Sequence, residues 1–401
     1  MNLLATLYWL CVALIFYHHV AYPVLLRQLA RRRPFTSPDP APIDSRLPSI
    51  SLIIPCHNEA AVVAKKIENV AQLAYPPELL SVVLALDGCT DNTRLEAENA
   101  INRLSQKANW RVIEYRQNVG KVAVLNDQVA QAQSEIVALS DASAVVPPDI
   151  FLRAASHFAD PKIGVVCPTY RLGAGAAKGE EAYWSYQRRL KSAEGRVAAP
   201  MGAHGALYLF RRALWEPLAE DTVNDDFILP MRIVLRGFKA VYDEAMVTAE
   251  LEKTAPGQDF RRRVRIGAGN MQQLLKLIQL GNPRRGKTAL VFLSGKGLRA
   301  VMPFLLASAV LMNAWLAYAD GGIYAWLLGT KLAILFIAAL AIVSPAVGKL
   351  PVFGQIAYVA MGHLASGWGA LLLLAGRHDR LWKASSDRKS RYLAALGGRA
   401  E

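Results

Sequence analysis

The chain has 401 residues, a formal net charge of +14 and a hydrophobic fraction of 53%. This length leaves room for one large domain with membrane segments or for two small domains. The hydrophobic fraction is high for a wholly soluble protein and argues against that class, because it indicates long apolar blocks.

The first apolar block predicts an N-terminal membrane helix. Residues 3–26 contain no Asp, Glu, Lys or Arg, and a helix of this length crosses a hydrocarbon layer of roughly 30 Å. No basic residues precede the block and it is longer than the apolar core of a signal peptide, so we expect it to be retained as a helix at 1–26. Four arginines follow between residues 27 and 33. By the positive-inside rule they predict that the next domain lies in the cytosol.

A basic and then Pro-rich segment at 27–47 is typical of a linker. After it, short apolar runs alternate with stretches of helical spacing. The apolar runs lie at 50–54, 82–86, 112–115 and 136–139, and the helical stretches at 59–73, 93–107 and 122–132. Strands that alternate with helices pair in parallel, with the helices as crossovers. The sequence therefore predicts an α/β fold with a doubly wound, mostly parallel sheet.

The second half of this domain gives mixed signals up to residue 250. It is predicted to extend the same sheet and to supply the acceptor side of a site. The expected strands are 163–166, 206–210 and 239–242, and the expected helices are 182–195 and 227–236. The whole catalytic domain is thus predicted at 48–250.

The last third of the chain is first basic and then apolar. Residues 261–299 contain ten Lys or Arg and no Asp or Glu, which predicts an interfacial or phosphate-facing segment at 251–297, or a positive-inside flank only. Apolar blocks at 300–319, 321–348 and 350–376 predict two or three membrane helices within 298–376. Three spans would leave the basic tail 377–401 outside, although its charge favours the cytosol. Either the last block is re-entrant or interfacial, or the tail is an exception.

Polar residues follow three of the predicted strands where each strand ends. Pro55, Asn58 and Glu59 come after the first strand, Asp87 after the second and Asp141 after the fourth. Taken singly, such residues also fit a turn or a helix start. Together they favour a site, because ligands of parallel sheets bind beyond the carboxyl ends of the strands. No glycine-rich phosphate loop follows these strands, so we expect acids and a divalent cation, Mg²⁺ or Mn²⁺, to meet the phosphates of a ligand.

A pair of acids and a run of arginines add candidates further along the chain. Asp225 and Asp226 begin a predicted helix, where they either cap its positive end or supply a general base. Arg262 and Arg265 belong to a cluster suited to bidentate contacts with a diphosphate. Trp184 lies on a predicted helix and either stacks on a sugar or packs in the core.

Seven segments between residues 48 and 300 stand in a fixed order. They are SLIIPCHNEA (51–60), LALDGCTDNT (84–93), GKVAVLND (120–127), LSDASAVVPPD (139–149), GAHGALYLFRR (202–212), NDDFILPMRI (224–233) and FRRRVRIGAGNMQ (260–272). Together they resemble the membrane-bound, inverting glycosyltransferases of family 2, a group that includes poly-N-acetylglucosamine, hyaluronan and cellulose synthases. The resemblance implies a GT-A-like fold and a nucleotide-sugar donor.

The resemblance also implies a role for each candidate residue. Asp226 would be the catalytic base beside Asp225, and Asp141 with Ser143 would form the metal element. The implied donor-binding residues are Pro55, Asn58, Glu59, Asp87, Lys121, Asp141, Arg262 and Arg265, and the implied acceptor residues are Gly205, Ala206 and Trp184.

Two positions depart from the family pattern. Ser143 stands where the family has a second metal-binding Asp, so one carboxylate is missing. The Gln-x-x-Arg-Trp element of processive synthases appears here as Arg262, Arg265 and Ile266, without its tryptophan. The lost tryptophan argues against long-chain processive synthesis.

The sequence thus predicts an inverting transferase that moves a sugar, UDP-linked by expectation, to a glycan acceptor for a surface polysaccharide. We expect a multi-pass protein of the inner or plasma membrane, with the catalytic domain cytosolic, room for an accessory subunit and no nucleic acid partner. Two alternatives stay open. One is a glycolipid-forming transferase with a lipid or polyprenyl phosphate acceptor, and the other is a non-catalytic nucleotide-binding subunit of a synthase.

Overall fold

The structure is a computed structural model that describes residues 3–43, 45–104, 109–172, 178–250 and 259–377. The predicted segments 1–26, 27–47 and 48–250 each include residues outside these ranges, and three further predictions lie partly or almost wholly outside them. They are the end of the helix at 93–107, the start of the segment at 251–297 and the tail at 377–401 after its first residue.

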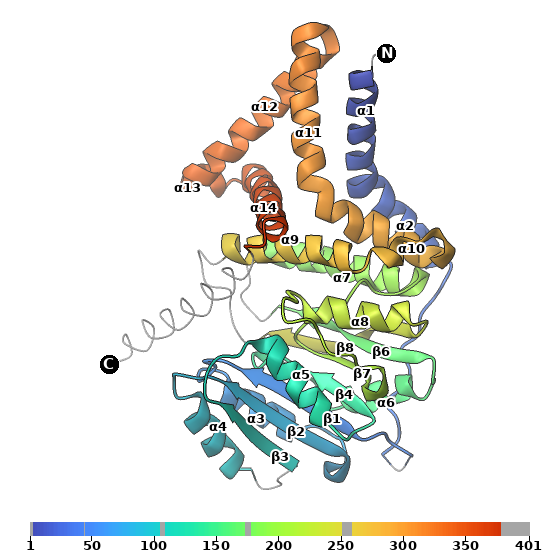
Figure 1. The fold of residues 1–401 in the computed structure, drawn as a ribbon, viewed down its shortest axis with the longest axis vertical. Coiled ribbons are helices and arrows are strands. Elements are labelled where there is room, and N and C mark those ends of the chain that lie inside the picture. The colour runs from blue at the N-terminus through green and yellow to red at the C-terminus, as the bar shows by residue number, and fades with distance from the viewer. Residues whose placement is uncertain (1–2, 44, 105–108, 173–177, 251–258, 378–401) are drawn as a thin grey trace. The chain divides into compact units, whose positions relative to one another are not determined.

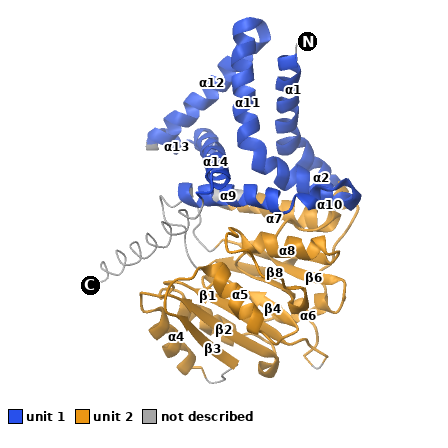
Figure 2. Cartoon of the chain, in the orientation of Figure 1, with its two compact units in different colours: residues 1–28, 254–386 blue, residues 29–253, 387–401 orange. Residues whose placement is uncertain are grey.

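The chain forms two compact units, which Figure 2 shows in different colours. The first unit is residues 1–28 with 254–386, and the second is residues 29–253 with 387–401. The predicted strands all belong to the second unit, and the predicted membrane helices belong almost entirely to the first.

The second unit contains an eight-stranded sheet with the order β3-β2-β1-β4-β7-β6-β8-β5 (Figure 1). Its strands are β1 (Ile50–Cys56), β2 (Leu80–Asp87), β3 (Asn109–Tyr115), β4 (Ile136–Leu139), β5 (Ala144–Val145), β6 (Ile163–Arg171), β7 (Tyr208–Arg211) and β8 (Lys239–Glu250). β1 pairs in parallel with β2 and β4, β2 with β3, and β6 with β8. β7 runs antiparallel between β4 and β6, and β5 runs antiparallel to β8. The predicted mostly parallel sheet is confirmed, whereas β5 and the direction of β7 were not predicted.

Helices pack on this sheet because its central strands are apolar on both faces. They are α3 (Val63–Ala71), α4 (Thr93–Asn102), α5 (Lys121–Gln131), α6 (Ile150–Phe158), α7 (Lys178–Val197) and α8 (Asp225–Leu235), with short 3₁₀ turns at η2 (Pro77–Leu79) and η3 (Arg212–Leu214). Leu52, Ile54 and Leu84 are buried in one core cluster with Ile67 of α3. Ile53 points to the other face and is fully buried as well.

The helix predicted from residue 59 begins only at Val63. Asn58 has a φ of 55°, in the left-handed region, so the chain turns sharply after β1. The Glu59 amide donates to Thr93 Oγ1 at 2.7 Å instead of entering a helix. The loops after β1 and β2 are therefore fastened to one another, which fixes the polar residues at both strand ends.

The predicted linker at 27–47 is held against the second unit. α2 (Tyr22–Arg31) extends into it, and Arg33 donates to the carbonyl of Val197 at 3.1 Å. The Ala41 amide donates to Leu152 O at 3.0 Å, and Ser37 Oγ donates to the buried Asp243 carboxylate at 2.5 Å. These bonds order a segment whose composition alone indicates a free spacer.

The first unit is helical in its described residues. Besides α2, it contains α1 (Leu3–Phe16), η1 (Tyr17–Ala21), α9 (Asp259–Lys276), η4 (Ile278–Gly281), η5 (Pro283–Arg285), α10 (Lys287–Val291), η6 (Phe292–Gly297), α11 (Leu298–Ala319), α12 (Gly322–Val343), α13 (Pro345–Gly348) and α14 (Pro351–Leu374). Four helical stretches are long and apolar enough to cross a membrane. They are Leu3–Arg31, Lys287–Ala319, Gly322–Val343 and Pro351–Leu374.

Lys331 is a charged residue in the middle of the apolar helix α12, and its ammonium binds polar side chains of the same unit. Its ammonium donates to Tyr8 Oη at 2.8 Å and to Asn313 Oδ1 at 2.6 Å. Asn313 also donates to the carbonyl of Tyr324 at 2.8 Å. A charge in an apolar layer is tolerated when it faces polar partners inside a bundle. This contact ties α12 to α1 and α11.

The basic helix α9 crosses α14 at close range. A Cβ added at Gly267 would stand 2.4 Å from Ser366 Cα, and one at Gly369 would stand 1.9 Å from Val264 O. Glycine at both positions lets the two backbones approach, as small residues do where membrane helices cross. Arg263 donates to Tyr358 O at 3.0 Å and lies over its ring at 3.8 Å. Part of the predicted basic segment therefore packs against the last apolar helix.

Candidate active site

The strand order changes direction at β1, and here the sheet opens. Pairing between β1 and β4 ends at Ile53 and Leu139, and the Ser140 amide makes a last bond to Ile53 O at 3.1 Å. β1 continues to Cys56 beside β2. Pro55 therefore sits where the β4 side of the ladder has ended, and its missing N–H costs no bond. Open α/β sheets bind their ligands beyond the strand ends at such a change in strand order.

Asp141 lies at this opening, in the turn after β4. Its amide donates to Gly205 O at 3.1 Å, and its carbonyl accepts from the Ala144 amide at 3.2 Å. Its carboxylate forms a salt bridge with Lys121, with Nζ and Oδ1 3.0 Å apart. The Asp141 side chain remains 38% exposed, so a ligand can reach it.

Lys121 joins carboxylates from two further segments of the second unit. It is the first residue of α5, and its ammonium lies 3.3 Å from Asp225 Oδ1 at the start of α8. Asp225 Oδ2 accepts a bond from Tyr208 Oη of β7 at 3.0 Å. Burial alone would lower the pKa of Lys121, but the Asp141 and Asp225 carboxylates raise it above its ordinary value. The ammonium ion is therefore the charge around which the acids are arranged.

The pKa values of Asp141 and Asp226 are shifted in opposite directions. The surrounding protein would by itself raise the pKa of Asp141, but the Lys121 ammonium holds it below the ordinary value. Burial and the adjacent Asp225 carboxylate raise the pKa of Asp226 to about 6. Asp226 is half-buried, whereas Asp225 is buried. A carboxylate with a raised pKa that stays accessible suits a general base.

The segment 202–206 closes the site from the side of β7. The Ala203 amide donates to Asp226 O at 2.7 Å, and Lys191 of α7 donates to Gly202 O at 2.9 Å. A Cβ at Gly205 would stand 2.8 Å from Asp141 Oδ2, so a larger residue here would displace the carboxylate. Ala206 is fully buried, and its carbonyl accepts from Ser140 Oγ at 2.6 Å.

Asp87 and Asn58, both predicted to bind a ligand, also fasten loops to one another. The Asp87 carboxylate accepts bonds from the amides of Val119 and Gly120, at 2.7 and 3.0 Å. Asn58 Oδ1 accepts from the Thr90 amide at 2.8 Å. Asp87 thus positions the loop that leads directly into Lys121. Both side chains are buried, and their predicted contact with a donor stays a prediction.

Lys66 belongs to the site although the sequence did not indicate it. It lies on α3, is 1% exposed and donates to Ser140 Oγ at 2.7 Å and to Ala144 O at 2.6 Å. These two atoms bracket the turn that carries Asp141. Burial lowers the pKa of Lys66 to about 8, against the attraction of Asp141. The sequence contains a sign of this burial, because the helical spacing places Lys66 on the same apolar face as Val63 and Val70.

Trp184 is half-buried among aromatic rings. Its ring centroid is 4.8 Å from that of Tyr170 and 5.4 Å from that of His204, in edge-on arrangements. Tyr170 and His204 stack at 3.7 Å. These three residues and Ala206 make a small cluster next to Gly205, which agrees with the core-packing interpretation of Trp184.

Arg262 and Arg265 lie on α9 in the first unit, whereas the acids lie in the second. Their predicted place beside a diphosphate stays a prediction. Glu59 is half-buried at the loop after β1. Ser143 lies in the turn after Asp141, also half-buried. Of the predicted site residues, the structure gathers Asp141, Lys121, Asp225, Asp226 and Gly205 into one place.

The residues present fit a divalent cation only if a ligand completes its shell. No group of three His, Cys, Asp or Glu side chains in the described residues is arranged to hold a metal. The Asp141 and Asp225 carboxylates both pair with Lys121, and Asp226 lies within its electrostatic reach. Magnesium is usually bound by one or two carboxylates together with substrate phosphates. Asp141 provides such a carboxylate, still partly exposed.

Comparisons with known proteins agree with this geometry. The mannosyltransferase PcManGT from Pyrobaculum calidifontis, solved with GDP-Man and Mn²⁺, superposes with a TM-score of 0.69 at 24% identity, covering 92% of this chain and 99% of that one. This likeness shows a shared fold and confirms the GT-A-like prediction.

Curated relatives match at similar identity. A poly-β-1,6-N-acetyl-D-glucosamine synthase of Staphylococcus aureus is 23% identical over 283 residues, which are 68% of this chain and 64% of the relative. A β-monoglucosyldiacylglycerol synthase of Synechocystis is 27% identical over 226 residues, covering 50% of this chain and 45% of that protein. The match thus spans less than two thirds of the length of either relative.

The family described as glycosyltransferase-like family 2 matches residues 48–269. This stretch contains every strand of the sheet and all the acids gathered around Lys121. It exceeds half of the chain, and the resemblance seen in the sequence is confirmed. The protein therefore belongs to the glycosyltransferase-like family 2.

Proposed function

We propose that this protein moves a sugar from a nucleotide-sugar donor to an acceptor hydroxyl, with inversion at the anomeric carbon. The observation that supports this most directly is the convergence of Asp141, Asp225 and Asp226 around Lys121 beyond the ends of β1 and β4. The relatives named above include a polymer synthase and a structure holding a nucleotide sugar, which favours the same donor class.

In the proposed reaction, Asp226 takes the proton of the acceptor hydroxyl. The hydroxyl oxygen forms a bond with the anomeric carbon, and the bond from that carbon to the diphosphate oxygen breaks. The electron pair leaves with the nucleoside diphosphate. Asp225 raises the proton affinity of Asp226 without contacting the acceptor, since its own oxygens bind Lys121 and Tyr208.

A divalent cation, Mg²⁺ or Mn²⁺, would supply positive charge to the departing diphosphate. Asp141 would hold it, with Ser143 in place of the second acid. Lys121 would stay beside Asp141 and add a fixed positive charge, and Arg262 and Arg265 are the proposed further contacts of the phosphates. Asp87, Asn58 and Glu59 would support the nucleoside side through the loops that they hold.

The proposed location is the cytosolic face of a cell membrane. Four apolar helical stretches and the arginines that follow the first of them support this orientation. The proposed acceptor is a glycan of a surface polysaccharide, shaped by Gly205, Ala206 and Trp184. A lipid acceptor is the second candidate, because Ile266 replaces the family tryptophan and one relative is a glycolipid synthase.

A donor screen tests the proposal directly. The full chain in detergent, with Mn²⁺, is given UDP-N-acetylglucosamine, UDP-glucose or GDP-mannose in separate reactions, and release of the nucleoside diphosphate is measured. Radiolabelled product is then sized and extracted with organic solvent, which separates a polymer from a single sugar on a lipid. Failure to release diphosphate from any donor, with membranes and both acceptor classes present, rules the proposal out.

The rate should fall on the acid side of pH 6. A base must be deprotonated, and the pKa of Asp226 is about 6, so its working fraction is nearly complete at pH 8 and declines as the pH falls through that value. Below it, the logarithm of kcat should drop by about one for each pH unit. Initial rates between pH 5 and 8.5 measure this limb, and a rate that stays level down to pH 5 would mean that the carboxyl with the raised pKa is not the base.

Lys66→Met should weaken cation use more than it slows the reaction. The turn of Asp141 loses two anchors, and a lost buried hydrogen bond costs about 1–3 kcal/mol, so we expect the Mn²⁺ concentration for half-maximal rate to rise about tenfold. Mn²⁺ titration of the initial rate measures this. Lys65→Met, on the exposed side of the same helix, is the matched control. Equal shifts in both variants would remove Lys66 from the site.

A further inference from the structure

Three imidazoles and one guanidinium gather in the described part of the first unit. His18 and His19 lie in η1, Arg299 lies at the start of α11 and His363 lies in α14. Ring centroids are 5.0 Å apart for His18 and His19 and 5.8 Å apart for His19 and His363. Arg299 acts electrostatically on all three rings. Three of the four apolar stretches thus contribute to one cluster.

Two π-helical turns build this cluster by facing one another. Tyr17 Oη and Ser294 Oγ are 2.8 Å apart, and His18 Nδ1 is 2.8 Å from Ser294 O. Because a carbonyl only accepts, His18 donates its Nδ1–H there and its ring is fixed. The fixed ring meets His19 edge-on. π-Helical turns are rare in proteins, and those that occur are often found at functional sites.

Among the residues that the structure describes, the positive charge of Arg299 has no partner of opposite sign. Among the described residues its guanidinium makes no hydrogen bond or salt bridge, and Asp259 and Asp320 are the acids that the described part of the first unit contains. Asp320 lies beyond the far end of α11, a helix of 22 residues. An uncompensated cation beside imidazole donors is suited to an anion.

Arg299 lies at one end of the apolar part of its helix. The stretch Lys287–Ala319 has 33 residues, or about 50 Å at 1.5 Å per residue, which exceeds the roughly 30 Å hydrocarbon layer. Residues 300–319 are uncharged and fill that layer, so Arg299 stands at its edge. His19 is exposed, and the apolar side chains of Val20 and Leu364 beside the cluster are exposed too.

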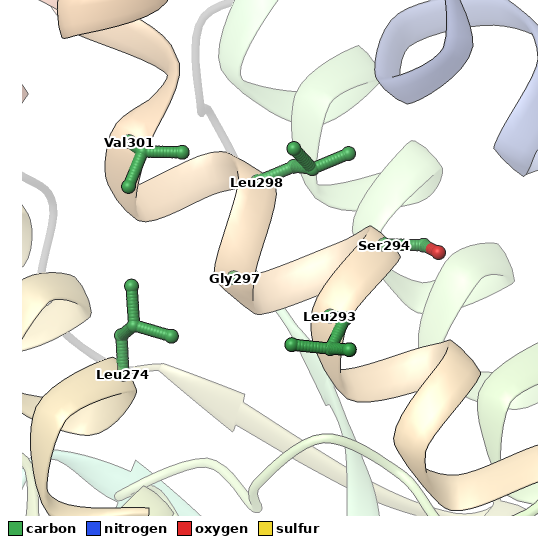
Figure 3. Close-up of a pocket in the computed structure, with 6 residues that line it drawn as sticks. All are labelled: Leu274, Leu293, Ser294, Gly297, Leu298 and Val301. Carbon is green, nitrogen blue, oxygen red and sulfur yellow. The ribbon is translucent and has the colours of Figure 1, made fainter. Parts of the chain in front are cut away.

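The same helical turn borders an apolar pocket of about 360 Å³. Its lining is Leu274, Leu293, Ser294, Gly297, Leu298 and Val301. Figure 3 shows the Ser294 hydroxyl on the other side of the turn from Leu274 and Val301. Apolar surface for hydrocarbon and polar groups for a headgroup therefore meet at η6.

We propose that His19, His363 and Arg299 bind the phosphate of an anionic membrane lipid, with His18 positioning His19. Basic pockets between membrane helices recognise such headgroups through charge and hydrogen bonds together. The acyl chains lie along the exposed apolar surface around the cluster. This inference does not rest on the proposed sugar transfer, since none of its groups belongs to the catalytic site.

Native mass spectrometry of the full chain in mixed micelles tests it, with phosphatidylglycerol or phosphatidylcholine added. We expect one phosphatidylglycerol to be retained, and Arg299→Gln and His363→Ala to weaken its binding about tenfold each. Arg299→Lys should retain most of the binding. Lys349→Gln, which removes an exposed cation elsewhere in the unit, should bind as the unmodified chain does.

A thermal unfolding midpoint in lipid-free detergent shows whether each variant is folded. Should Arg299→Gln not fold, His19→Gln, at an exposed ring, gives the same measurement. Equal retention of phosphatidylcholine, or equal binding by Arg299→Gln and Lys349→Gln, would overturn the proposal. Displacement of the lipid by millimolar inorganic phosphate would show a free-anion site and would also overturn it.

Discussion

Asp226→Asn should lower kcat by about a thousandfold, within the range that a positioned general base contributes. The amide has nearly the shape of the carboxylate, so the backbone bond from Ala203 and the start of α8 should persist. Donor binding should change little, because Lys121 contacts Asp141 and Asp225 and forms no salt bridge with Asp226 among the described contacts. Diphosphate release measures the rate, and isothermal titration with the unreactive nucleoside diphosphate and Mn²⁺ measures binding.

Glu220→Gln is the matched control for this substitution. Glu220 is an exposed acid six residues earlier in the chain, and its removal changes the net charge by the same amount. It should leave both the rate and binding unchanged. A rate for Asp226→Asn within tenfold of the unmodified chain, at pH 8 and with binding intact, would exclude Asp226 as the base.

The position of a strand was predictable where its own residues are apolar enough to indicate burial on both faces of the sheet. β4 coincides with its predicted run, and β1 and β2 extend theirs by two or three residues, because strands covered on both faces are continuously apolar. β5 has two residues and carries no pattern of its own. The direction of β7 is set by its neighbours β4 and β6, which no local periodicity reveals.

In the candidate site, too, local sequence predicted some residues, whereas others depend on contacts between distant segments. Asp141, Asp225 and Asp226 were predictable because they stand at strand or helix ends, where a sheet of this kind binds its ligands. Asp87 stands at such an end too, and its carboxylate accepts hydrogen bonds from two amides of a loop that begins 32 residues further along the chain. The sequence pattern did not indicate these two bonds. Lys66 and Tyr208 act across long sequence separations, so their roles depend on contacts that a sequence pattern does not contain.

Lys121→Gln should shift the acid limb of the pH profile upward as well as slow the reaction. Without the ammonium, Asp141, Asp225 and Asp226 lose a shared positive charge, and the pKa of Asp226 rises because the Lys121 ammonium lowers it in the unmodified chain. At an effective dielectric constant of about 20, a nearby unit charge shifts a pKa by about one to two units. The rate at pH 7 should fall about a hundredfold, and part of the loss should return at pH 9. Initial rates across pH measure both effects.

The charge and the shape of Lys121 are separable by two further variants. Lys121→Arg keeps the positive charge and should keep the acid limb near its original position, even if its bulk slows the reaction. Lys162→Gln removes an exposed lysine from the same unit and should change neither limb nor rate. If Lys121→Gln loses activity equally at every pH, the lysine serves the donor phosphates alone. The raised pKa of Asp226 would then depend on Asp225 and burial, and Asp225→Asn should move the limb downward.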